Sequence, residues 1–368
     1  MNLYSIRILV SQPLRLILTV GGVALCILLM LFLISVYHGV AEGSMLYIRH
    51  NSADLWVLQN NSWNILRGTS LLSTGHGIML RRLPYVESAS PILLGLPAIS
   101  AHGRTVSTFL VGYDPNEPLG GPPHIVRGRA IENDDEIVLD EAFCARMGIE
   151  VGTTVEMNDE PLQVVGISSG TNAFVIQYSF VSLNRAQIVA GFSTIVSCYL
   201  VKIRPGYGIP KAAKLLHDDL PGVEVFDHPT FIENNYREMQ SGFLPLLFTI
   251  ATIGAIVLTV ILSLLLSISI LERRKDFAVM KTIGSPSAFL SAVVSGQALA
   301  LCMAGSVLAL VLFFPLCQIV MTLTPELSPI VKIEHVGVVV LAAAMISLTS
   351  SFISLQRLRN IYALEAFI

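Results

Sequence analysis

The sequence predicts a multi-pass α-helical membrane protein with four transmembrane helices (1+3) and an α+β extracytoplasmic domain of two β-α-β halves plus an inserted β-rich subdomain. Three observations predict this class. Only 13% of the 368 residues are charged, about half the share of an ordinary soluble domain, and 53% are hydrophobic. The apolar residues form four long charge-free runs. Between the first two runs, residues 43–242 carry 14 Lys and Arg and 20 Asp and Glu, as a folded polar domain would.

Each charge-free run is long enough to cross a bilayer core, which needs about 20 apolar residues. The runs contain 22, 29, 41 and 21 residues, and they lie at 16–37, 243–271, 285–325 and 336–356. We expect Pro315 to end the third helix, which is therefore placed at 288–313. The first run is longer than the core of a signal peptide, so an uncleaved anchor fits better than a cleaved leader.

Basic residues set the expected orientation. The segments before helix 1, between helices 2 and 3, and after helix 4 must share one face, and they hold eight Lys and Arg against three acidic residues. The positive-inside rule places this face in the cytoplasm, with both termini. The expected order is a cytoplasmic-face helix (1–15), helix 1 (16–37), an outer domain (38–242, with an insert at about 124–195), helix 2 (243–271), a cytoplasmic loop (272–287), helix 3 (288–313), a short outer loop (314–335), helix 4 (336–356) and a cytoplasmic tail (357–368).

The outer domain shows a weak internal repeat. Leu83-Pro84-Tyr85-Val86-Glu87 returns as Leu220-Pro221-Gly222-Val223-Glu224, and each copy follows a helix-like segment and opens a strand-like one. This favours two related β-α-β halves, with chance as the alternative. The strand-like stretches of the first half are 52–59, 86–99 and 105–112, and its helix is expected at 72–83.

The inserted stretch has clearer local signals. Glu136 to Leu139 is strand-like, Asp140 can cap a short helix from Glu141 to Met147, and Gly148 can end it. Residues 151–157 and 162–167 predict a hairpin across residues 158–161. After the second half, residues 228–240 predict a helix that runs toward helix 2, so movement of one could shift the other.

Motifs for chemistry are weak in this sequence. There is no Gly-Lys dipeptide, so a P-loop is excluded, and the eight histidines show no metal-ligand spacing. Residues 166–170 match G-x-S-x-G around Ser168, but the following residues are strand-like, where a nucleophile elbow would enter a helix. A turn between strands is therefore favoured over a membrane-anchored hydrolase. Cys144 and Cys198 both lie outside, and their pairing stays open.

The membrane segments carry no charged residue, which argues against an ion-driven relay within this chain. Gly296, Ala300 and Ala304 form a small-residue stripe, suited to packing within one subunit or to a dimer contact. In the cytoplasmic loop, Phe277, Met280 and Ile283 recur at helical spacing. Such an amphipathic helix fits a groove on a partner or the membrane interface.

Residues 272–284, Glu-Arg-Arg-Lys-Asp-Phe-Ala-Val-Met-Lys-Thr-Ile-Gly, closely resemble the E-R-(R/T)-(R/K)-E-I-(G/A)-x-(L/M)-(R/K)-A-(I/L)-G segment of FtsX-like permeases. These are the membrane subunits of MacB-type ABC transporters. Asp276, Phe277 and Thr282 depart mildly from that pattern. The resemblance covers the whole chain, including an amphipathic N-terminal helix (2–18), the F-x-V-V-G-I/V strand of the outer domain (162–167), the stretch after it (180–187) and the closing tail (357–366).

The resemblance implies that a separate ABC ATPase binds residues 272–284 as a coupling helix, through Glu272, Arg273, Arg274, Lys275, Asp276, Phe277, Met280, Lys281, Ile283 and Gly284. ATP and Mg²⁺ would be held by that ATPase, with no cofactor, metal or catalytic residue on this chain. It further implies an inner-membrane dimer, with itself or a paralogue, and a periplasmic adaptor or outer-membrane channel as further partners. Lipid surrounds the helices, and no nucleic acid is expected.

Two functions stay open from the sequence. The first is a permease subunit that exports or extracts a lipid, lipoprotein, peptide or small toxic compound. The alternative is an FtsX-like mechanotransmitting regulator, which activates an enzyme outside the membrane instead of moving cargo. The large outer domain with its insert favours the first.

Overall fold

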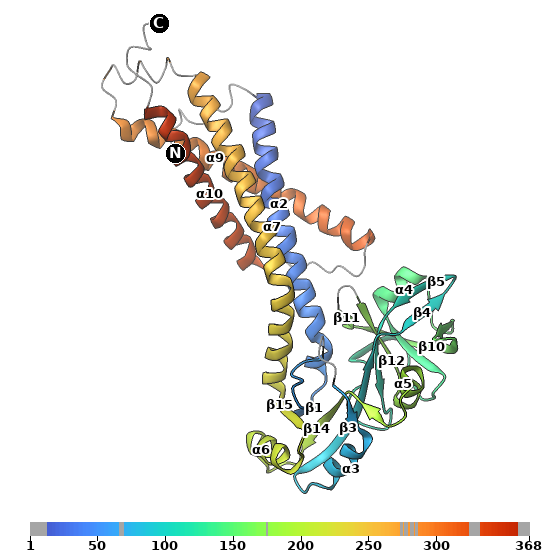
Figure 1. The fold of residues 1–368 in the computed structure, drawn as a ribbon. Helices are drawn as coiled ribbons and strands as arrows, with labels where there is room; N and C mark the ends of the chain where they lie inside the picture. Colours follow the sequence, from blue (N-terminus) through green and yellow to red (C-terminus); the bar gives the residue numbers. More distant parts are fainter. Residues whose placement is uncertain are drawn as a thin grey trace. The chain divides into compact units, whose positions relative to one another are not determined.

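The computed structural model describes residues 13–65, 70–173, 176–272, 286–323 and 332–359, together with the single positions 275, 279 and 283 (Figure 1). The chain divides into two compact units. The first, the helical unit, consists of Met1–His38, Leu244–Val320 and Pro329–Ile368. The second, the outer unit, consists of Gly39–Phe243 with Met321–Ser328.

Four helices in the described part of the chain are long and apolar enough to cross a membrane, which confirms the predicted one-plus-three arrangement. They are α2 (Pro13–His50), α7 (His228–Glu272), α9 (Ser287–Leu323) and α10 (Ile333–Arg359). A buried apolar cluster joins them in the helical unit, where Ile27 of α2, Leu262 of α7 and Phe313 of α9 are almost fully buried. Apolar side-chain packing therefore holds these helices together, and the hydroxyls of Ser295 and Ser351, 3.1 Å apart, add a hydrogen bond between α9 and α10.

The helices are longer than the charge-free runs predicted. The expectation that Pro315 ends the third helix is wrong, because α9 continues through this residue to Leu323. Pro245 also lies inside a helix. The predicted helix at 228–240 and the predicted helix 2 are parts of one continuous helix, α7. A proline removes one backbone donor, but packed membrane helices tolerate this loss better than an isolated helix does.

The outer unit contains a mixed sheet, and four of its thirteen described strands belong to two interleaved β-α-β units. Strands β15, β1, β14 and β3 are neighbours in this order, and each pair is antiparallel. Consequently β1 runs parallel to β3, and β14 runs parallel to β15. The first unit is β1 (Leu55–Gln59), α3 (Thr74–Arg82) and β3 (Val86–Gly95), and the second is β14 (Cys198–Ile203), α6 (Ile209–Asp219) and β15 (Val223–Asp227).

This topology confirms the predicted two halves, in the interleaved form of a ferredoxin-like split. Residues 83–87 and 220–224 of the sequence repeat join α3 to β3 and α6 to β15, which are equivalent places in the two units. The predicted helix at 72–83 begins two residues late, because β2 (Leu72–Ser73) pairs first with β13 (Ile195–Val196).

Between β3 and β13 the chain adds the β-rich part of the sheet. Its strands are β4 (Ala98–Ala101), β5 (Arg104–Ser107), β6 (Phe109–Tyr113), β7 (His124–Gly128), β8 (Glu136–Asp140), β9 (Thr154–Met157), β10 (Glu160–Ser169), β11 (Asn172–Ala173) and β12 (Ile176–Ser182). Two helices lie in the same stretch, α4 (Glu141–Met147) and α5 (Leu183–Ala190). These strands form the inserted β-rich subdomain, which continues the same sheet from β6 to β5. The insert therefore begins at Ala98 and not near residue 124, and residues 98–113, which were predicted to belong to the first half, are part of it.

Two local predictions in this insert are confirmed. Asp140 Oδ1 accepts a hydrogen bond from the backbone N of Ala142 at 2.8 Å and so caps α4, which ends at Gly148 with φ of +67°. The predicted hairpin joins β9 to β10, but its turn has only two residues, Asn158 and Asp159, because residues 160 and 161, predicted in the turn, already pair with β9. Asn158 and Asp159 both have positive φ, as the tight turns of hairpins require.

Candidate functional site

The segment predicted to contact an ATPase connects α7 to α9. Seven of its ten candidate residues lie outside the described residues: Arg273, Arg274, Asp276, Phe277, Met280, Lys281 and Gly284. Of the other three, Glu272 is the last residue of α7, and Lys275 is helical and exposed. Ile283 has 80% of its side-chain surface exposed.

The described positions of this segment show one helical contact. The backbone N of Ile283 donates to the carbonyl O of Val279 at 3.1 Å, an i to i+4 hydrogen bond. Val279 and Ile283 therefore lie on one face of a helical turn, and Val279 is also exposed, by 45%. Two exposed apolar side chains on one face, next to a membrane helix, are the feature that an apolar groove on a partner would cover.

The outer end of α2 is part of the core of the outer unit. Tyr47 is fully buried, stacks on Tyr178 with ring centroids 5.1 Å apart, and donates from its hydroxyl to the carbonyl O of Gly120 at 3.0 Å. Asn51 follows α2 and accepts from the backbone N of Gly120 at 2.8 Å. One loop residue is thus held through both of its backbone groups, which fixes the end of this helix to the sheet.

The outer end of α7 is held on the same side of the sheet. Trp56 of β1 donates from its Nε1 to Nδ1 of His228 at 3.3 Å, and its ring stacks on Phe231 with centroids 4.4 Å apart. One turn further, Asn235 is fully buried, and its Oδ1 accepts from the backbone N of Ile65 at 3.0 Å. The contacts of Trp56 join β1 to α7, and the bond from Ile65 joins α7 to the segment that follows β1.

Alternate residues of β1 explain how the sheet holds both helices. Trp56 and Leu58 pack in the cluster that contains Tyr47 and Phe231, from the ends of α2 and α7. Leu55 and Val57 point to the opposite face and pack with Leu80 of α3 and Leu216 of α6, among others. Sequence reasoning missed this sandwich, although four consecutive apolar residues in β1 are the signal of a strand buried on both faces.

The small-residue stripe on α9 lies beside the close contact that α9 makes with α2, but it is not part of that contact. Gly296 and Ala300 are half-buried, and Ala304 is exposed. The close approach within the helical unit occurs at Gly305, where an added Cβ would lie 2.5 Å from Cγ1 of Val23 on α2. The stripe itself stays available as the predicted packing or dimer contact.

Ser168 has the surroundings of a structural residue. It is fully buried at the end of β10, and its Oγ lies 2.9 Å from Oγ1 of Thr171, which donates to Oδ2 of Asp140 at 2.7 Å. Gly170 turns the chain with φ of +72° into a strand, not a helix, so the geometry is that of the predicted turn. Burial raises the pKa of the Asp140 carboxyl, which is held by the cap of α4.

The two outer cysteines are unpaired thiols. Cys144 and Cys198 are both buried, in different apolar clusters of the outer unit. Burial raises the pKa of each thiol to about 12. Both therefore behave as apolar packing residues, and the disulfide left open by the sequence is not formed.

Comparison with known families agrees with this architecture. The model of the MacB-like periplasmic core domain matches residues 16–218, and the model of the FtsX-like permease C-terminal region matches residues 248–363. The chain belongs to the MacB- and FtsX-like family of ABC transporter permeases. The permease therefore has an extracytoplasmic domain, and the resemblance drawn from residues 272–284 is confirmed at the level of the family.

Relatives of similar length align with most of the permease. An ABC transporter permease of Mycobacterium tuberculosis is 26% identical over 337 residues, covering 89% of each chain. An ABC transporter permease of Mycobacterium bovis is 24% identical over 359 residues, covering 96% of this chain and 95% of the relative. Among solved structures, the periplasmic region of MacB from Actinobacillus actinomycetemcomitans aligns with 15% identity and a TM-score of 0.40, over 50% of this chain and 94% of that one.

Proposed function

We propose that this permease converts ATP-driven movement of a separate ABC ATPase into movement of its outer unit, and so exports or extracts a cargo. Two copies, or one copy and a paralogue, form the membrane part of the complex. ATP and Mg²⁺ are bound by the ATPase, and this chain takes no part in the hydrolysis chemistry. In this proposal the segment 272–284 is the contact with the ATPase.

The observation that carries this proposal is the continuity of α2 and α7. Each helix begins or ends inside the aromatic core of the outer unit and continues without a break into the helical unit. On its other side, α7 ends at Glu272, where the proposed contact begins. A force on this segment therefore acts on α7, whose outer end is held by the contacts of Trp56 and Asn235. In this proposal, movement of α7 is passed to the outer unit through these contacts.

The proposed orientation follows from the basic residues and can be tested by labelling. Trp63 is exposed in the outer unit and Lys275 is exposed in the connecting segment, whereas the five native cysteines are all buried. We expect a membrane-impermeant maleimide to label Trp63→Cys in intact spheroplasts and Lys275→Cys only after the membrane is opened. Labelling of both variants, or of neither, in intact spheroplasts would contradict the orientation.

The ATPase contact is tested by adding charge to its apolar face. Phe277→Asp and Met280→Asp should abolish copurification with the ABC ATPase that the wild-type permease retains, because each buries a carboxylate in an apolar groove. Leu96→Asp is the matched control, since Leu96 is an exposed apolar residue of the outer unit and receives the same charge. If the two variants keep the ATPase and its stimulated hydrolysis, the proposed contact is wrong.

A further inference from the structure

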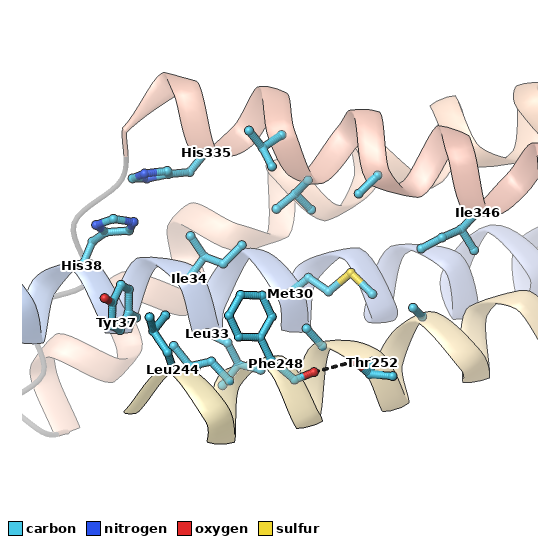
Figure 2. Close-up of a pocket in the computed structure, with 16 residues that line it drawn as sticks. Met30, Leu33, Ile34, Tyr37, His38, Leu244, Phe248, Thr252, His335 and Ile346 are labelled. Atoms are coloured by element: carbon cyan, nitrogen blue, oxygen red, sulfur yellow. Dashed lines mark hydrogen bonds between the residues drawn. The ribbon is translucent and has the colours of Figure 1, made fainter. Parts of the chain in front are cut away.

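Figure 2 shows a pocket within the helical unit, between α2, α7 and α10. Its volume is about 540 Å³, which lies within the range of about 300–1,000 Å³ found for small-molecule sites. The residues that line it carry no carboxylate, lysine or arginine, and most of them are aliphatic. A hydrophilic solute would lose its hydration there without compensation, so the pocket suits an apolar ligand.

Three of the four polar side chains that line this pocket, Tyr37, His38 and His335, gather at one end (Figure 2), and the hydroxyl of the fourth, Thr252, donates to the carbonyl O of Phe248 on its own helix at 2.7 Å. His38 of α2 stacks on His335 of α10, with ring centroids 3.8 Å apart and planes 14° from parallel, and Tyr37 lies beside His38. The Nδ1 atom of His335 is buried and has no hydrogen-bond partner among the residues that the structure describes. A buried ring nitrogen without a partner is costly, and a ligand with a polar group at this end would satisfy it.

The apolar part of the pocket has the length of one lipid leaflet. The lining of α10 extends from His335 to Ile346, which is about 16 Å along a helix that rises 1.5 Å per residue. Half of a hydrocarbon core of about 30 Å is about 15 Å. The polar end lies where α2 continues into the outer unit, so it corresponds to the outer surface of the membrane.

We propose that this pocket binds one acyl chain from the outer leaflet, with the polar head of the lipid hydrogen-bonded to His335 and the chain extending toward Ile346. Binding of an acyl chain in this pocket does not depend on the proposed function. The further idea, that the bound lipid or lipidated polypeptide is the exported cargo, rests on that proposed function. The occupant is an amphiphile because the lining changes from polar to apolar along one axis. A bound acyl chain would fill the pocket with the apolar contacts that its lining offers.

The test uses the full-length permease, without its ATPase, in nanodiscs of phosphatidylethanolamine and phosphatidylglycerol. One probe is phosphatidylglycerol with a photoreactive diazirine near the end of one acyl chain, and the other is a diacylated lipopeptide with the same modified chain. Mass spectrometry then locates the cross-links. We expect label near Thr252 and Ile346, at the end of the pocket away from the histidines, above the level on exposed apolar residues such as Val260.

Matched variants decide whether the label comes from the pocket. Ala342 lines the pocket and Leu341, its neighbour on α10, is exposed and does not. Ala342→Trp should reduce the pocket label by about fivefold or more, because the indole occupies the space of the chain, and Leu341→Trp should leave it unchanged. His335→Phe keeps a flat ring but removes Nδ1, and it should also weaken the label.

The outcomes distinguish a membrane lipid from a lipidated polypeptide as the ligand. They also distinguish failure of the pocket proposal from failure of the proposed function. Label from phosphatidylglycerol alone assigns the pocket to a membrane lipid, and label from the lipopeptide alone assigns it to a lipidated polypeptide. Equal label on pocket and exposed residues overturns the inference, as does label that Ala342→Trp does not change in protein with a wild-type melting temperature. Cross-linking of Ala342→Cys to a second copy would assign the pocket to a dimer contact and also overturn it. Because no ATPase is present, each of these results leaves the proposed coupling untouched.

Discussion

The indole Nε1 of Trp56 donates a hydrogen bond to Nδ1 of His228 at 3.3 Å, and this bond connects the first strand of the outer unit to the first residue of α7. An accepting Nδ1 carries no proton, so the contact requires a neutral imidazole. Burial, together with the positive charge of Lys202, lowers the pKa of His228, and nearby Asp54 and Asp227 oppose this shift only in part. The junction is therefore formed with the uncharged ring.

The first prediction concerns acid stability. The imidazole of an unfolded chain has a pKa of about 6.5 and the folded one is lower, so below about pH 6.5 the unfolded chain binds the proton more readily. The stabilisation from His228 is complete above about pH 6.5 and is lost as the pH falls through the folded pKa. We expect the melting temperature of the wild-type permease to fall between pH 7.5 and 5.5 by more than that of His228→Asn. Equal falls would show that this imidazole does not titrate on unfolding.

The second prediction concerns the contact between α9 and α2. Gly305→Val places side-chain atoms where Val23 already lies, and overpacking of this kind costs about 1–3 kcal/mol. Gly337→Val in α10 is the control, because an added Cβ there meets no atom within 4 Å. Thermal unfolding in detergent should show a lower melting temperature for Gly305→Val than for Gly337→Val, and the reverse order would contradict the packing.

The third prediction concerns the outer end of α2. Tyr47→Phe keeps the ring and its stacking but leaves the carbonyl O of Gly120 without this donor, at a cost of about 1–3 kcal/mol. Tyr207→Phe, at an exposed tyrosine, should lower the free energy of unfolding by far less. Chemical denaturation of the two variants followed by tryptophan fluorescence compares them, since Trp56 lies in the same core as Tyr47. If Tyr47→Phe lowers the free energy of unfolding by no more than Tyr207→Phe does, the hydrogen bond from Tyr47 to Gly120 contributes nothing to stability.

The fourth prediction concerns the exposed face of the connecting segment. Ile283→Asp should weaken ATPase binding by about 1 kcal/mol or more, because the change removes an apolar contact and places a carboxylate in the apolar groove of the partner. Ile283 is almost fully exposed in this chain alone, so the same change should leave the melting temperature of the isolated permease unaltered. A variant that is less stable but binds the ATPase normally would place Ile283 in a structural contact instead.

Local signals in the sequence predicted local structure well. The helix from Glu141 to Met147 is defined by a capping aspartate and a terminal glycine that act within a few residues, and it was predicted to the residue. The four transmembrane helices were predictable for a similar reason, since length and lack of charge suffice. Their ends were not, because the path of α9 through Pro315 depends on packing with neighbouring helices.

The contacts on which the proposed coupling depends could not be predicted from one sequence. The bond between Trp56 and His228 joins residues 172 positions apart, and no local pattern marks either residue as the partner of the other. The same is true of the pocket, whose lining comes from three helices. A four-residue apolar strand indicates burial on both faces, but it does not show which helices pack on each face.

The position of β1 in the sheet also has a consequence for biosynthesis. This strand is the first of the outer unit to be made, yet its two neighbours are β14 and β15, the last two. During export of the nascent chain, β1 must remain without β14 until about 140 residues have followed it across the bilayer, and without β15 until about 170 have followed. Chaperones outside the membrane would therefore find this apolar segment exposed throughout that interval, which makes the first strand the point where misassembly of a growing chain would begin.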